Sequence, residues 1–129
     1  METTIILTWR LNNMKLQGKV WGNTKFIFGN NNFEIHRIEV DSGGHCSLHR
    51  HEHKYNAFYL ESGKLKIIIE QQDYDLKDET VMKKDDLTIV KPGLYHSFEA
   101  LEDTVCYEIY WSELDHDDIQ RKNVGGMFK

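Results

Sequence analysis

Closely spaced histidines are the feature of this sequence that could most directly do chemistry. Within the stretch "HRHEHKYN" (residues 49–56), His49, His51 and His53 occupy every second position. Because side chains two residues apart on a β-strand point the same way, we expect His49 and His51 to project side by side from one face of a strand. Neighbouring neutral imidazoles can bind a metal ion, so this pair is a candidate for two metal ligands.

A turn further along the chain can supply a third ligand. The stretch "DDLTIVKPGLYHSFE" (85–99) indicates a strand, a tight Pro-Gly turn and a second strand that begins near His96. Pro92 fixes its own φ, and Gly93 permits the positive φ that such a turn often needs. We therefore expect the turn to direct His96 inwards, toward His49 and His51.

The residue types of this set decide what kind of centre it would be. Three neutral imidazoles suit one divalent metal ion, and zinc, iron, manganese, nickel and copper all remain open. Asn56 offers only a neutral amide oxygen, so we expect three histidines and water, with Asn56 as a distant fourth ligand or a hydrogen-bond partner. Such a centre keeps its full positive charge and leaves positions open for substrate or dioxygen.

The elements that must position these residues are strands. Residues 104–112 alternate with period two, and residues 64–70 and 87–91 are short β-branched runs that suit buried strands. Residues 33–40 also indicate a strand, with a bulge near His36 or apolar side chains on both faces. Turn signals follow at 29–32, 41–44, 61–64, 83–86 and 91–93. Together they predict one all-β domain, a sandwich or barrel.

Composition excludes several classes of function. The chain has 129 residues and a formal net charge of −5. Binding to nucleic acid needs a concentrated basic face, and the scattered lysines provide none. No apolar run is long enough for a membrane span, and the N-terminus does not resemble a signal peptide. The two cysteines, Cys46 and Cys106, are expected to be reduced and packed. We therefore expect a cytoplasmic protein.

Two motifs in the right order resemble those of the cupins. "GGHCSLHRHEHKYNAFYLESG" (43–63) matches the first cupin motif at Gly43, His49, His51 and Gly63, with Asn56 at the position of the usual glutamate. "DDLTIVKPGLYH" (85–96) matches the second motif at Asp86, Pro92, Gly93 and His96, with Asp85 at the position of the usual glycine. The resemblance implies a double-stranded β-helix, a jelly-roll barrel, with His49, His51 and His96 as metal ligands.

Three further segments resemble the type II mannose-6-phosphate isomerases, in which this cupin is often the C-terminal domain of a mannose-1-phosphate guanylyltransferase. They are "VWGNTKFIF" (20–28), "HRIEVDSGGHCSLHRH" (36–51) and "YWSELDHDDIQR" (110–121). The basic residue of that family falls on Lys54, and the histidine beside its glutamate has become Ala57. The family's closing Tyr-Gly-Arg is missing, and so is the guanylyltransferase domain.

The resemblance also implies how the chain is divided. We expect an N-terminal extension over residues 1–18, a cupin domain over 19–121 and a short C-terminal tail over 122–129. Ile5, Leu7, Trp9 and Leu11 alternate within the extension and could add an edge strand. Cupin-like sheets often pair, so a homodimer is expected.

The predicted site is compatible with three functions of different classes. In a sugar-phosphate isomerase, the metal ion would polarise a carbonyl while a base moves a proton between C1 and C2. A three-histidine iron dioxygenase would bind dioxygen at the open positions. A binding module would recognise a sugar or a nucleotide sugar without turnover.

Candidate residues for the isomerase reading lie near the histidines or on neighbouring strands. The candidates for the base are Glu52, His53 and Glu108. The candidates for substrate binding are Lys54 and Arg37 at a phosphate and Tyr55 at the sugar ring. The mannose-6-phosphate isomerases remain the nearest functional analogy, with a sugar phosphate as the expected ligand.

Overall fold

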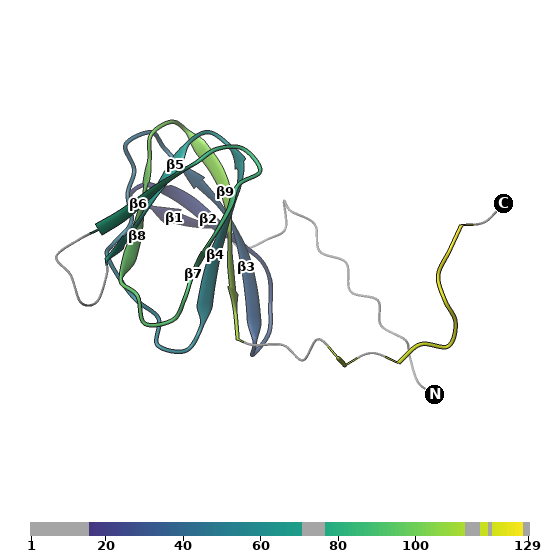
Figure 1. Cartoon of the computed structure of the whole chain (residues 1–129). Helices are drawn as coiled ribbons and strands as arrows, with labels where there is room; N and C mark the ends of the chain where they lie inside the picture. The colour runs from purple at the N-terminus through teal and green to yellow at the C-terminus, as the bar shows by residue number, and fades with distance from the viewer. Residues whose placement is uncertain (1–15, 71–76, 113–116, 119, 128–129) are drawn as a thin grey trace.

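The described residues form two antiparallel β-sheets (Figure 1). The structure is a computed structural model, and it describes residues 16–70, 77–112, 117–118 and 120–127. The larger sheet has the order β1 (Leu16–Lys19), β2 (Gly22–Gly29), β3 (Phe33–Val40), β9 (Thr104–Trp111), β4 (Tyr55–Ser62) and β7 (Leu87–Val90). The smaller sheet has the order β6 (Lys77–Met82), β5 (Leu65–Glu70) and β8 (His96–Ala100). The prediction of an all-β, two-sheet fold is confirmed.

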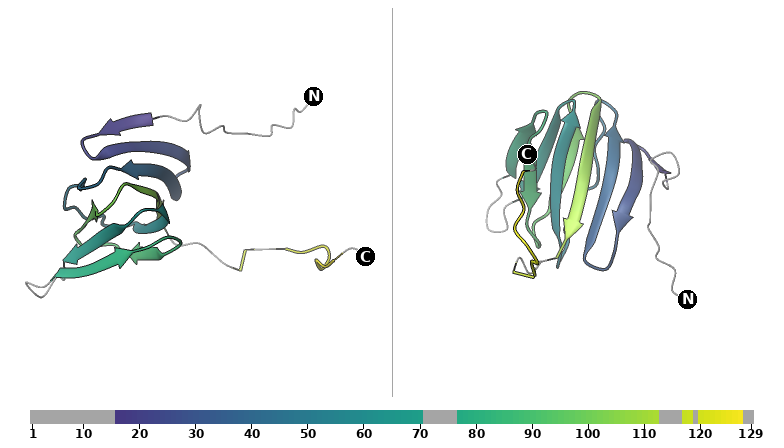
Figure 2. Two further views of the ribbon diagram at one scale, coloured as in Figure 1. Left: turned by 90° about the horizontal axis from the view of Figure 1, so that it is seen from above. Right: turned by 90° about the vertical axis from the view of Figure 1, so that its right-hand side faces the viewer.

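The core lies between the two sheets. From the larger sheet, Ile38 and Leu60 are fully buried, and from the smaller sheet so are Leu65 and Ile67. Apolar side chains of this kind are the main source of stability in such a fold, because each buried one contributes about 1.5–3 kcal/mol. β9 lies in the middle of the larger sheet, between β3 and β4 (Figure 2). A residue on the inner face of β9 therefore lies between the two sheets.

The alternation along β9 places its polar half on the inside. Cys106 has no exposed surface, so the residues of the same parity, Glu108 and Tyr110, also face inwards. The more apolar half, which comprises Val105, Tyr107, Ile109 and Trp111, faces the other way. The strand was predicted correctly, but a hydrophobic pattern alone would have placed Glu108 outside.

The structure decides two local predictions for strands. β3 pairs with β9 over all eight of its residues without a shift, and Ile35 and Ile38 lie on its opposite faces, so of the two alternatives the strand that is apolar on both faces is the correct one. The bulge lies in the neighbouring strand β2, between Phe26 and Phe28. The segment that carries His49 and His51, which was predicted to be a strand, forms no continuous ladder with β8, because its bridges to β8, His45 with Glu99 and His49 with His96, are isolated. Between the two bridges this segment has three residues (46–48), whereas β8 has two (97–98). An extra residue on one side interrupts the ladder of hydrogen bonds between two strands.

The ends of the chain add little regular structure within the described residues. β1 forms the edge of the larger sheet, next to β2. The extra strand predicted from Ile5 to Leu11 lies outside the described residues. Residues 120–127 form neither helix nor strand. No helix in the described residues is long and apolar enough to cross a membrane.

The turn before β7 holds Asp85 in a conformation that favours glycine. Its φ is 69°, in the left-handed region, and it is the residue that replaces the glycine of the second cupin motif. Two hydrogen bonds hold it there, since the Asp85 amide donates to the carbonyl of Leu60 at 2.8 Å and the Tyr59 hydroxyl donates to Oδ1 of Asp85 at 2.8 Å. Aspartate tolerates this region better than most residues, but it is still strained there relative to glycine.

Replacing Asp85 should separate backbone strain from the lost side-chain contact. We expect Asp85→Gly to be more stable than Asp85→Ala by about 1 kcal/mol, because both lose the bond from Tyr59 and only glycine relieves the left-handed φ. Chemical denaturation of the two variants measures this difference. Equal stability of the two would show that position 85 is not strained.

Candidate metal centre and its cavity

Three histidines from two distant segments meet at one end of the core. His49 and His51 come from the connection between β3 and β4, and His96 is the first residue of β8. One ring nitrogen from each lies within 4.8 Å of the other two. The ring centroids of His49 and His96 are 4.6 Å apart, and those of His49 and His51 are 5.1 Å apart. The structure therefore brings the three predicted ligands together in a cluster that could hold a metal ion.

Backbone hydrogen bonds fix two of these rings in the form a metal needs. Nδ1 of His49 lies 2.8 Å from the carbonyl oxygen of Ser47, and Nδ1 of His96 lies 2.9 Å from that of Leu94. A carbonyl oxygen can only accept, so Nδ1 carries the proton in each neutral ring. Nε2 then keeps its lone pair, which is the arrangement that second-shell carbonyls impose on metal-bound histidines.

The third ring, His51, has a buried nitrogen without a partner. Nε2 of His51 is inaccessible to solvent and makes no hydrogen bond to any described residue. Burial, together with the charges of Lys54, His49 and His96, lowers the pKa of His51 to about 4. Burial also lowers the pKa of His96. These rings stay neutral at pH 7, and an orphaned buried nitrogen is what a metal ion would satisfy.

Asn56 lies beside the cluster, at the position of the usual cupin carboxylate. Its side chain is buried on β4, and Oδ1 lies 3.1 Å from Nε2 of His96. Asn56 therefore contacts the nitrogen with which His96 would bind a metal ion.

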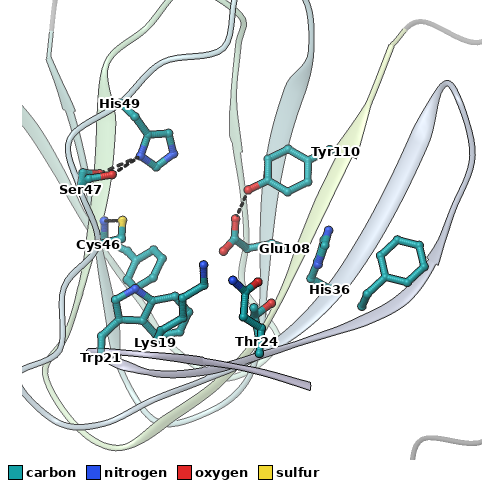
Figure 3. A pocket seen from close by; sticks show the side chains of 12 residues that line it. Lys19, Trp21, Thr24, His36, Cys46, Ser47, His49, Glu108 and Tyr110 are labelled. Carbon is teal, nitrogen blue, oxygen red and sulfur yellow. Dashed lines mark hydrogen bonds between the residues drawn. The ribbon is translucent and has the colours of Figure 1, made fainter. Parts of the chain in front are cut away.

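A cavity of about 530 Å³ opens next to the cluster (Figure 3). His49 and Glu108 both point into it, from the β3–β4 connection and from β9. The Tyr110 hydroxyl donates a hydrogen bond to Oε2 of Glu108. Burial raises the pKa of Glu108, although hydrogen bonds from Tyr110 and Asn56 and the charges of His36 and His49 oppose the shift. A buried carboxyl group whose pKa is raised is a stronger base than an exposed one, which suits proton transfer.

The other two candidates for the base lie outside this cavity. The side chains of Glu52 and His53 are 74% and 93% exposed, and they form a pair with each other at 3.6 Å. Both line a second cavity of about 620 Å³, together with His51 and Lys54. Tyr110 separates the two cavities and lines both of them. Of the three predicted bases, the structure thus brings Glu108 alone into the cavity that His49 lines.

The predicted substrate-binding residues are dispersed. Arg37 alternates on β3 with His36, which lines the first cavity, so Arg37 faces away from it. There its guanidinium is paired with Glu39 at 2.6 Å and with Glu61 at 3.8 Å. Tyr55 stacks on Trp111 with ring centroids 5.3 Å apart. The Lys54 ammonium lies 4.5 Å above the ring of Tyr110.

The sequence comparisons agree with this geometry. A family model described as "Cupin domain" matches residues 36–111, a range that contains the three histidines, Asn56 and Glu108. The chain belongs to the cupin family. No curated protein matches it in sequence.

This cupin is similar in fold to several solved structures. KdgF from Halomonas sp. has a TM-score of 0.68 and 15% identity, over 80% of this chain and 92% of that one. CapF, a capsular polysaccharide assembling protein from Staphylococcus aureus, has a TM-score of 0.67 and 20% identity, over 81% of this chain and 30% of that one. Oxalate decarboxylase from Bacillus subtilis, which has Mn(II) centres, has a TM-score of 0.72 and 16% identity, over 88% and 31%. The chain thus spans less than a third of the last two, and these identities indicate the fold alone.

Sequence reasoning missed several residues of the cupin cavity. His36 on β3 lines it, and Nε2 of His36 lies 3.1 Å from Oε2 of Glu34. Lys19 and Trp21 reach it from the β1–β2 hairpin, and Cys46 reaches it from the β3–β4 connection. The alternation of side chains along a strand would have grouped Gln17 with Lys19 on one face. It could not have shown that this face is the inner one.

The cluster makes a direct prediction for metal content. We expect His51→Ala to weaken binding of a divalent ion by more than about 100-fold, because loss of a ligand should cost more than loss of a second-shell partner. His53→Ala is the matched control, since this side chain is almost fully exposed two residues away. Metal analysis of the purified variants measures the effect. Equal metal content in the two variants would contradict the assignment.

Position 56 makes a second prediction for the metal. Asn56→Glu should tighten binding of a divalent ion by about tenfold or more, because it adds a negative charge next to Nε2 of His96. Asn123→Glu adds the same charge at an exposed position that lines neither cavity, and it should have no effect. Titration with a competing chelator compares the affinities. If Asn56→Glu binds the ion no more tightly than the unchanged protein, the side chain at position 56 does not face the ion.

Proposed function

We propose that this cupin is a metal-dependent enzyme that acts on a sugar phosphate in the manner of a mannose-6-phosphate isomerase. The observation that carries the proposal is the position of Glu108, a half-buried carboxyl group that points into the same cavity as His49. In this proposal His49, His51 and His96 hold a divalent metal ion, and Glu108 is the proton-transfer group.

In this reaction the main task of the protein is to place one base near C1 and C2 of the substrate. An aldose becomes a ketose when a proton leaves C2, the C–H electron pair forms a C1–C2 double bond, and a proton returns at C1. Oxygen-bound protons shift from O2 to O1 in the same process. Glu108 can take the C2 proton and return it at C1, so the group ends the cycle unchanged. A bound metal ion would supply Lewis-acid polarisation of the carbonyl oxygen.

The surroundings of Glu108 support this role. Burial raises its pKa, which makes the carboxylate a better base than an exposed one. The Tyr110 hydroxyl holds one carboxylate oxygen in place, and therefore fixes the direction in which the other points. Pre-positioned groups of this kind account for much of the rate of proton-transfer enzymes.

The remaining candidates suit the role less well. The side chains of Glu52 and His53 are exposed to solvent, so neither is held in a shielded position beside a bound substrate. CapF, which shares this fold, is a capsular polysaccharide assembling protein, and a sugar ligand would be consistent with that likeness.

Glu108→Gln should remove turnover and leave the metal in place. With mannose-6-phosphate as substrate and coupled detection of fructose-6-phosphate, we expect a loss of about 10²–10⁴-fold, the usual contribution of a positioned base. Glutamine keeps the size of the side chain and can still accept the bond from Tyr110. The metal content of Glu108→Gln, measured in the same preparation, should match that of the unchanged protein.

Glu52→Gln is the comparison that separates the two candidate bases. It removes a carboxylate of the same kind outside the cavity, and turnover should persist. Loss of turnover in Glu52→Gln but not in Glu108→Gln would contradict the assignment of the base. Saturable binding of the sugar phosphate by a metal-loaded sample without any product would contradict the enzyme proposal and favour a binding module.

A further inference from the structure

The cavity that contains Glu108 has a cation at its edge that the motifs do not include. Among the described residues that line this cavity, Lys19 is the one lysine or arginine. It comes from β1, the edge strand of the larger sheet, outside the segment that matches the cupin family. We propose that Lys19 binds the anionic group, a phosphate or a carboxylate, of a small sugar held in this cavity. The inference rests on the proposed function for the choice of a sugar.

The register of the β1–β2 hairpin explains why Lys19 faces the cavity. Gln17 pairs with Thr24 and Lys19 pairs with Gly22, so these positions share one face of the hairpin. Gln17, Lys19 and Thr24 all line the cavity. Figure 3 shows the Lys19 side chain directed into the cavity, between Trp21 and Glu108.

The ammonium group of Lys19 is not neutralised by an ion pair within the described part of the protein. By contrast, Arg37 on β3 of the same sheet is paired with Glu39 and Glu61. Lys19 forms no ion pair with any described carboxylate, including Glu108 in the same cavity. A divalent ion at the three histidines would make the cavity more positive still. An incoming anion would therefore meet an attractive field and an ammonium with free donors.

The walls of the cavity suit a hydroxylated ligand. Trp21 packs edge-on against Phe98 with ring centroids 5.1 Å apart, and both side chains line the cavity. Aromatic faces of this kind bind the C–H faces of a sugar ring. Gln17, Thr24 and Ser47 add groups that can donate and accept hydrogen bonds to hydroxyls. A site with apolar walls and a few convergent polar groups is typical of small-molecule binding.

Lys54 is the alternative cation, and the structure places it elsewhere. Its ammonium lies on the ring of Tyr110, in the second cavity with Glu52 and His53. Tyr110 therefore stands between Lys54 and Glu108. A ligand whose reacting carbons lie at Glu108 would extend toward Lys19 within one cavity, without having to pass Tyr110.

Calorimetric titration of the full chain, loaded with Mn(II), tests the proposal directly. The probes are mannose-6-phosphate, glucuronate and mannose, which separate phosphate, carboxylate and neutral sugar. We expect the unchanged protein to bind at least one of the two anions roughly tenfold or more tightly than mannose. In Lys19→Met this preference should fall by about 10–100-fold, the range expected for one charge-assisted hydrogen bond, while affinity for mannose and metal content stay unchanged. Lys19→Arg should restore most of the preference.

Lys25→Met is the matched control for net charge. Lys25 lies between Thr24 and Phe26 on β2, both of which line the cavity, so its side chain points to the opposite face. We expect Lys25→Met to keep the preference. An equal loss in the Lys19 and Lys25 variants, a loss in Lys54→Met instead, or no preference for either anion in the unchanged protein would each overturn the proposal.

The same titrations distinguish this inference from the proposed function. If anion binding depends on Lys19 but mannose-6-phosphate is not isomerised, the assignment of Lys19 stands and the isomerase proposal fails. If isomerisation occurs and Lys19→Met leaves both the affinity and KM unchanged, the assignment of Lys19 fails and the isomerase proposal stands.

Discussion

Two backbone hydrogen bonds between His49 and His96 hold the candidate metal centre together. The His49 amide donates to the carbonyl of His96 at 3.0 Å, and the His96 amide donates to the carbonyl of His49 at 2.8 Å. The Gly93 amide adds a third bond, to the carbonyl of His51 at 2.7 Å. Since the segment that carries His49 and His51 forms no strand, these bonds to β8 and to the Pro-Gly turn are what set the position of the ligands. The cluster thus depends on the pairing of two segments far apart in sequence.

The inner face of the larger sheet changes from apolar to polar along its strands. Near one end, Ile38 and Cys106 pair across β3 and β9 and are fully buried. The next pair on the same face is formed by His36, two residues before Ile38 on β3, and Glu108, two residues after Cys106 on β9. Burying these polar groups is tolerated because each has a partner, Glu34 for His36 and Tyr110 for Glu108. One strand pair therefore supplies both part of the core and the polar wall of the cavity.

The sequence predicted those features of the fold and the site that are encoded within one short segment of the chain. Alternation and turn residues located most strands, and the HxH spacing with the Pro-Gly turn located the three histidines, because each signal lies within one short segment. Which face of a strand is the inner one is set by the packing of the whole barrel. Arg37 and Glu108 show the consequence, since both were candidates and only Glu108 faces the cavity. Lys19 was missed for the same reason, on an edge strand without a motif.

Asn56 connects the two chemical parts of the site, and its amide explains how they can coexist. Its Oδ1 lies 3.1 Å from Nε2 of His96, and its amide also opposes the rise in the pKa of Glu108 that burial causes. A carboxylate at position 56 would add a second negative charge beside Glu108, and like charges at such a short range push one of the two groups to hold its proton. The amide avoids this repulsion, so the negative charge near the cluster resides on β9 instead of β4. This cupin thus has an amide at the position of the usual cupin carboxylate, and its carboxylate, Glu108, lines the cavity instead, where the proposed function requires it.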